Sequence, residues 1–238
     1  MSRTGEYSET ARKVFGLLAL ITWANLALNF TLTIFNVYPS QNTNPNLLGF
    51  NPDGIAGLIG RSIDFFSYFT IVSNIVVALV LTWLWRRGSG WPSYWTRVFR
   101  LDSLMMITIT CIVYIALLAP TANPRGLEVV TNALEHYIVP ILVIVTWLIW
   151  GPRGWFSVSA IFAALVVPIL WAGYSLLRGA VIHAYPYPFL NVDALGFTAV
   201  LTTILEIAVF GVVLGFVFWG IEAVIVRVGS RTRELVDA

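Results

Sequence analysis

The sequence predicts an all-α integral membrane protein with six membrane-spanning helices. Hydrophobic residues make up 58% of the 238 residues and charged residues only 11%, which is too apolar a composition for an ordinary soluble domain. The chain also contains six apolar stretches near the length of about 20 residues that a bilayer requires. They cover residues 14–37, 63–85, 101–119, 131–150, 155–177 and 195–226. We expect residues 1–238 to form one membrane domain of six packed helices.

The distribution of basic residues predicts the orientation of these spans. Eleven of the fourteen Lys and Arg residues fall in the two termini and in the second and fourth connections, against three elsewhere. By the positive-inside rule, both termini are therefore expected to be cytoplasmic. This orientation favours a plasma membrane, or the inner membrane of a bacterium. The eleven residues are Arg3, Arg12, Lys13, Arg86, Arg87, Arg97, Arg100, Arg153, Arg227, Arg231 and Arg233.

Polar side chains recur on one face of each of the first three spans. One face of the first span carries Thr22, Asn25, Asn29 and Asn36. One face of the second carries Ser67, Thr70 and Asn74, and the third has Ser103, Thr110 and Tyr114 near one face. Because amides in hydrocarbon need partners, these faces are expected to point into the bundle. For the first span we favour contacts between helices over a functional site.

The fourth span, TNALEHYIVPILVIVTWLIW, carries a histidine about one turn from its outer end. An ionisable side chain at membrane depth is costly unless it faces protein or water, so His136 is a candidate functional residue. Asn132 lies four residues earlier on the same face and could orient it. Pro140 lies four residues later and leaves the carbonyl of His136 without its helical partner. Glu135, about 100° away, is not expected to orient the imidazole.

The last two spans and the loop between them add further candidates. Pro168 is expected to kink the fifth span, and Arg178 closes its outer end. The outward loop GAVIHAYPYPFLNVD suits a structured cap over an outward-facing cavity. In the last span Thr198, Thr202 and Glu206 align on one face, which places Glu206 near the bilayer midplane, either protonated or paired.

Thr70 and His136 are expected at equal depth. Both of their spans run inward, and counting from the outer ends places each residue about 8 to 10 Å deep at about 1.5 Å per residue. A hydroxyl and an imidazole at one level could act as nucleophile and base. The alternative for Thr70 is a hydroxyl bonded only to its own helix.

Several other classes of site lack support in the sequence. Two histidines without a metal-ligand spacing do not indicate a metal site, although His183, Asp64 and Asp193 also lie toward the outer side. No phosphate-cradling glycine loop or G-x-S-x-G motif occurs, and no basic run with interleaved aromatics indicates nucleic-acid binding. We therefore expect no cofactor, no metal and no nucleic-acid partner. The sequence does not predict an oligomeric state.

Three short motifs resemble the androgen-induced and androgen-dependent family of multi-pass membrane threonine hydrolases. They are SYFT in the second span, NALEH followed by a proline in the fourth, and YPYPFL before the last span. The resemblance implies a six-span hydrolase of fatty acid esters of hydroxy fatty acids, with Thr70 as nucleophile and His136 as base. The partner would then be a membrane lipid or fatty acyl ester.

The supporting roles and the rival function are also predicted. By their expected faces Asn74, Asn132 and Tyr114 are candidate oxyanion donors, and Arg178 could pair with a fatty carboxylate. Glu206 is an additional candidate beside the site. The rival function is a small transporter or lipid-binding protein in which His136 and Glu206 handle protons or hold a headgroup.

Overall fold

The computed structural model describes residues 8–40, 42–87 and 91–236, with side chains described up to residue 230. Arg3 and the side chains of Arg231 and Arg233, which the charge distribution uses, lie outside the described residues. The described chain is helical, and its one β-bridge joins Leu47 to Tyr185. Six of its helical segments are long and apolar enough to cross a membrane, which makes the chain an integral multi-pass membrane protein.

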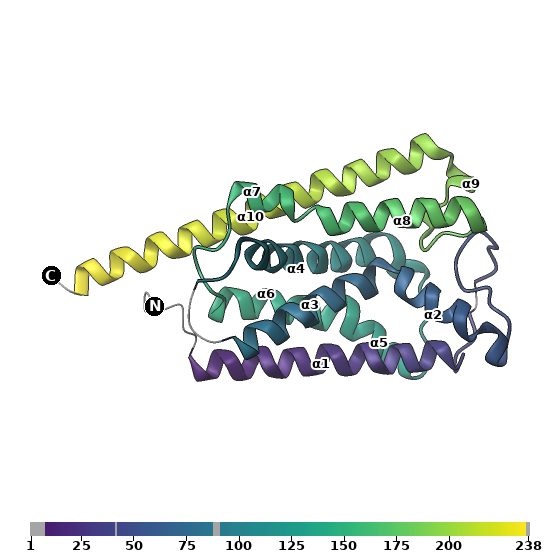
Figure 1. Cartoon of the computed structure of the whole chain (residues 1–238), viewed down its shortest axis with the longest axis horizontal. Coiled ribbons are helices and arrows are strands. Elements are labelled where there is room, and N and C mark those ends of the chain that lie inside the picture. Colours follow the sequence, from purple (N-terminus) through teal and green to yellow (C-terminus); the bar gives the residue numbers. More distant parts are fainter. Residues whose placement is uncertain (1–7, 41, 88–90, 237–238) are drawn as a thin grey trace.

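The spanning segments agree with the predicted stretches in number and order but differ at their ends. They run over Glu9–Ile34, Phe69–Arg86, Tyr94–Thr121, Leu127–Trp150, Val158–Ile182 and Phe197–Ser230. The first and third begin well before the predicted apolar stretches, because polar residues extend a helix that hydropathy alone cuts short. The last belongs to α10 (Phe197–Val236), which continues past the bundle at the end where α1 begins (Figure 1).

The second span is the main departure from the prediction, because it is not one helix. It is divided into α2 (Leu58–Ser67) and α3 (Phe69–Arg86) by Tyr68, whose backbone is extended at φ −77° and ψ 132°. The apolar composition of residues 63–85 gives no sign of this break. As a consequence Thr70 is the second residue of a helix and not the middle of one.

Two turns of π-helix interrupt the third and fourth spans. Tyr114–Leu118 (η2) follows α4 (Tyr94–Val113), and Leu134–Ile138 (η4) lies between α5 (Leu127–Ala133) and α6 (Val139–Trp150). Pro140 would clash with the carbonyl four residues before it in a regular α-helix, and the widened turn relieves this clash. Such turns occur often at functional sites.

The fifth span is also divided. α7 (Val158–Ala163) and α8 (Val166–Ile182) are separated at residues 164–165, four and three residues before Pro168, as the predicted kink requires. α8 then runs beside α10 toward the end of the bundle that carries α2 and the short helix α9 (Val192–Leu195) (Figure 1).

The first and fifth connections pack together over this end of the bundle. The backbone N–H of Leu48 donates to the carbonyl of Tyr185 at 3.0 Å, and that of Tyr185 donates to the carbonyl of Asn46 at 2.9 Å. A Cβ on Gly179 would lie 2.0 Å from the Tyr185 ring, so glycine permits this close approach. The loop predicted to form a structured cap is therefore ordered and packs over this end of the bundle.

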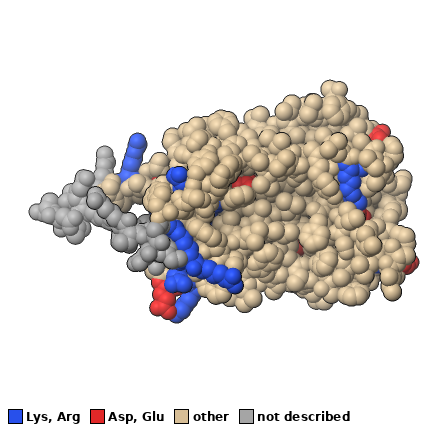
Figure 2. All heavy atoms as spheres, in the orientation of Figure 1, with Lys and Arg blue, Asp and Glu red and all other residues tan. Residues whose placement is uncertain are grey.

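Charge is distributed as a bilayer requires. The blue Lys and Arg side chains gather mainly at the end of the molecule where the chain begins and ends, and the broad surface between the two ends is largely uncharged (Figure 2). Both ends of the described chain lie on this basic side (Figure 1), which an even number of spans requires.

Candidate active site

Thr70 lies at the N-terminus of α3, directly after the break at Tyr68. The first N–H groups of a helix have no intrahelical acceptor, so each needs another partner. The N–H groups of Ile71 and Val72 donate to the carbonyl of Tyr68 at 3.1 and 3.2 Å. The N–H of Thr70 donates instead to the hydroxyl of Tyr187 at 3.2 Å. Because of the break, the backbone N–H next to the Thr70 hydroxyl donates to a side chain and not within the helix.

His136 contacts the Thr70 hydroxyl directly. Its Nε2 lies 3.2 Å from Thr70 Oγ1, and its Nδ1 lies 3.1 Å from the carbonyl oxygen of Asn132. A carbonyl can only accept, so Nδ1 carries the proton and Nε2 has a free lone pair. Nε2 therefore accepts from the Thr70 hydroxyl, which is the arrangement of a base poised beside a nucleophile.

Tyr114 and Asn132 hold the imidazole in place. The Tyr114 ring stacks on the His136 ring with centroids 3.7 Å apart and planes 23° apart. The Asn132 side chain donates to the Tyr114 hydroxyl at 2.8 Å. Asn132 was expected to orient His136, and it does so through its backbone carbonyl, while its amide fixes Tyr114. In this bond the Tyr114 hydroxyl is the acceptor, and the oxyanion roles of Tyr114 and Asn132 stay predictions.

Asn74 connects the two helices that carry the pair. Its amide donates to the carbonyl of Thr70 at 2.8 Å and to that of Glu135 at 3.4 Å. Both bonds use the amide nitrogen, so Asn74 sets the spacing between α3 and η4. An oxyanion role for Asn74 finds no support in this arrangement.

Sequence reasoning missed Glu135. The carboxylate is 3% exposed and accepts from the amides of Asn25 at 3.3 Å and Asn29 at 2.7 Å. Glu135 and His136 are both buried and line one cavity, but Glu135 bonds to the first span and not to His136, in agreement with the expectation that it does not orient the imidazole. The amide stripe of the first span was the signal, because its donors needed an acceptor on a neighbouring helix.

Sequence reasoning also missed Tyr187, in the loop between α8 and the short helix Pro188–Leu190. Its hydroxyl accepts from Thr70 N–H and lies 3.4 Å from Thr70 Oγ1. Burial raises the pKa of Tyr187 above its ordinary value, and hydrogen bonds with Thr70 and the Phe69 backbone lower it. The phenol therefore stays protonated at neutral pH and can donate. The motif YPYPFL contains this residue, but no pattern distinguished it from the other aromatic residues of the loop.

Arg178 and Glu206 lie outside the site. Arg178 forms an ion pair with Asp64 at 2.5 Å and donates to Ser67 Oγ at 3.3 Å. Asp64 also accepts from Asn51 at 2.7 Å, so this cluster fastens α8 to α2 and the first connection. Glu206 is exposed on α10 and, among the described residues, makes no hydrogen bond or ion pair. Neither residue lines the three cavities described next.

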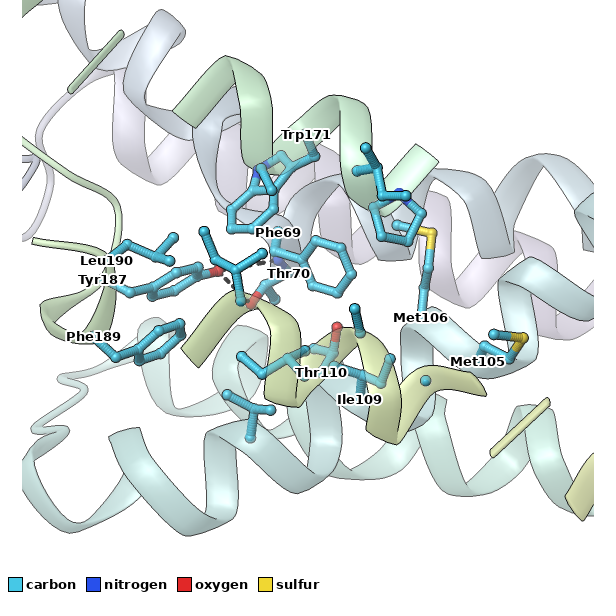
Figure 3. Close-up of a pocket in the computed structure, with 18 of the residues that line it drawn as sticks. Phe69, Thr70, Met105, Met106, Ile109, Thr110, Trp171, Tyr187, Phe189 and Leu190 are labelled. Atoms are coloured by element: carbon cyan, nitrogen blue, oxygen red, sulfur yellow. Dashed lines mark hydrogen bonds between the residues drawn. The ribbon is translucent and has the colours of Figure 1, made fainter. Parts of the chain in front are cut away.

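Three cavities adjoin one another around Thr70 and His136. The first, which we call the apolar chamber, lies between α4, α8 and α10 and includes Thr70 in its wall (Figure 3). The second, the connecting cavity of about 250 Å³, is lined by Thr70, His136 and Glu135 among others. The third, the polar vestibule of about 590 Å³, shares Asn29 and Glu135 with the connecting cavity. Thr70 thus lies between the apolar chamber and the connecting cavity, and the connecting cavity meets the polar vestibule at Asn29 and Glu135.

Among the residues that the structure describes, no group of three His, Cys, Asp or Glu side chains could hold a metal ion.

Comparisons with known proteins do not identify a family. No family model, no curated protein and no solved structure matches this chain. The resemblance to the androgen-induced and androgen-dependent hydrolases stays a prediction from three short motifs.

Proposed function

We propose that this protein is a membrane-embedded lipid ester hydrolase with Thr70 as nucleophile and His136 as general base. The observation that carries this proposal is the chain of contacts from Thr70 Oγ1 to His136 Nε2 and from His136 Nδ1 to the Asn132 carbonyl. The alternative for Thr70 is a hydroxyl bonded only to its own helix. Such a hydroxyl would not contact an imidazole whose other nitrogen already donates to a carbonyl.

The surroundings of the pair suit an ester that is apolar at one end. The apolar chamber can hold the acyl chain, and the connecting cavity and polar vestibule can supply water and receive the alcohol. Ester hydrolysis needs both environments at one carbonyl. A fatty acid ester of a hydroxy fatty acid is the substrate that the sequence resemblance favours.

The reaction follows from the positions of the groups. Thr70 Oγ1 attacks the ester carbonyl while its proton passes to His136 Nε2, and a tetrahedral oxyanion forms. The Thr70 N–H and the Tyr187 hydroxyl, which now bond to each other, are the donors nearest the new oxygen–carbon bond. His136 then gives its proton to the departing alcohol oxygen, which leaves an acyl-threonine. Water from the connecting cavity cleaves the acyl-threonine by the same proton transfers in reverse order.

The orientation of the site in the membrane completes the proposal. The basic end of the bundle is placed in the cytoplasm and the end with α2 and α9 faces outward. The Thr70–His136 pair then lies in the outward half, where a lipid ester can enter from the side. We propose the plasma membrane, or the inner membrane of a bacterium, as the location.

The test is hydrolysis of a fatty acid ester of a hydroxy fatty acid by the purified protein in detergent. Thr70→Ala removes the nucleophile and should abolish turnover and labelling by a fluorophosphonate probe. His136→Ala should reduce turnover by about 10²- to 10⁴-fold, the usual contribution of a general base. Thr108→Ala is the matched control, because Thr108 is as buried as Thr70 but bonds only to the carbonyl of Leu104.

The outcomes separate the enzyme from the rival function. Full activity in a folded Thr70→Ala variant would overturn the nucleophile assignment. If folded wild-type protein neither hydrolyses a panel of lipid esters nor reacts with the probe, the hydrolase proposal fails and a carrier or lipid-binding protein becomes the better account of His136. Folding of each variant is checked by thermal melting.

A further inference from the structure

The apolar chamber next to Thr70 extends from the loop before α10 to the methionines of α4. Its walls come from α4, α8, α10 and that loop, and only a few polar atoms line it. In Figure 3 Thr70 lies between Tyr187, Phe189 and Leu190 on one side and Met105, Met106 and Ile109 on the other. The loop residues line the outer end, and the methionines and Ile109 line the deep end.

The wall of the chamber includes the division between α7 and α8. This division lies at residues 164–165, just before Pro168, and Leu165 and Pro168 both line the chamber. On the facing helix, Gly211 lines the same deep end. A Cβ on Gly211 would lie 3.4 Å from Ile109 and 3.6 Å from Leu165, so any longer side chain at this position would occupy the chamber itself.

The length of the chamber gives the size of the group that fits. Along α4 the chamber extends from Tyr114 to Met105, which at about 1.5 Å per residue is about 13 Å. An extended carbon chain advances about 1.3 Å per bond, so a chain of at most about ten carbons fits this length.

We infer that the apolar chamber binds one unbranched acyl chain of about eight to ten carbons and that Gly211 and Met105 set the upper limit of its length. This inference rests on the proposed hydrolase function and adds the substrate class: esters of medium-chain fatty acids. The carbonyl lies at Thr70, and the terminal methyl group lies between Met105, Ile109 and Gly211. Chains that are longer must leave the chamber or bend within it.

The first test is a series of p-nitrophenyl esters with acyl chains of four to sixteen carbons. In the wild type, kcat/KM should rise about fourfold for each methylene up to eight to ten carbons, the equivalent of about 0.8 kcal/mol per buried methylene, and then fall. Gly211→Leu should move the optimum to shorter chains by about four carbons, the number its side chain adds. Gly220→Leu is the matched control on the same helix, because nothing lies within 4 Å of its Cβ.

A second measurement tests the chamber without any turnover. Decanol should raise the melting temperature of the wild type and of Gly220→Leu, because a ligand that binds only the folded protein stabilises it. It should raise that of Gly211→Leu much less. Hexanol should stabilise all three proteins to a similar extent.

The outcomes distinguish failure of the inference from failure of the proposed function. Active protein with the same chain-length profile in the wild type and Gly211→Leu would refute the chamber as the acyl site while leaving the hydrolase intact. Absence of hydrolysis, together with decanol stabilisation that Gly211→Leu loses, would refute the hydrolase and retain the chamber as a binding site. Equal stabilisation of all variants by decanol would also refute the chamber.

Discussion

The variant Tyr187→Phe tests whether the Tyr187 hydroxyl only supports the fold or also stabilises the oxyanion. The change keeps the ring, which stacks on Phe189 with centroids 5.2 Å apart, and removes only the oxygen that accepts from Thr70 N–H. The lost bond leaves a buried backbone donor without its acceptor, a cost of about 1 to 3 kcal/mol in stability. Loss of one oxyanion donor lowers kcat by about 10²- to 10³-fold, or about 2.7 to 4 kcal/mol.

We therefore expect Tyr187→Phe to fold with a slightly lower melting temperature and to lose about 100-fold or more in kcat with KM near that of the wild type. The assay is steady-state hydrolysis of the substrate that gives the highest wild-type rate. Tyr185→Phe is the matched control, because Tyr185 lies two residues away in the same loop and is also buried, but its hydroxyl makes no bond to Thr70. If both variants turn over at the same rate, the Tyr187 hydroxyl does not act in the transition state and only the Thr70 N–H remains as the local donor.

The two charged residues outside the site give opposite predictions. Arg178→Met removes the cation paired with the largely buried Asp64, so it should destabilise the protein by about 3 kcal/mol in thermal or denaturant unfolding while the folded fraction keeps its kcat. A drop in activity only toward substrates with a free carboxylate, at unchanged stability, would instead restore the pairing with a fatty carboxylate predicted for Arg178. Glu206→Leu should leave hydrolysis unchanged, because Glu206 is exposed and contacts no residue of the site. Loss of function in this variant with retention in Thr70→Ala would favour the carrier.

The amino-acid sequence by itself determined the class of this protein and the level of its candidate site. The apolar stretches are long enough to cross a bilayer, and their number gives the number of spans. Each span is a helix because it must satisfy its own backbone hydrogen bonds in hydrocarbon. Helical spacing placed the amide stripes, and Asn25 and Asn29 do point into the bundle, toward Glu135. Counting from the outer ends predicted equal depth for Thr70 and His136, and the structure brings them into contact. Their catalytic roles stay predictions.

Tertiary structure alone decided which surfaces meet. In a membrane both the lipid-facing and the protein-facing sides of a helix are apolar, so hydropathy does not tell which side packs inward. For this reason the sequence aligned Thr198, Thr202 and Glu206 on one face without telling which way that face points, and in the structure all three are exposed.

The same limit explains the residues that were missed or misplaced. Arg178 finds its partner 114 residues earlier in the chain, and Tyr187 reaches Thr70 from 117 residues away. The break at Tyr68, which turns Thr70 into a helix-terminal residue, is set by packing and not by any proline or glycine in the segment. Contacts between distant segments depend on the fold, and no local pattern of residues encodes them.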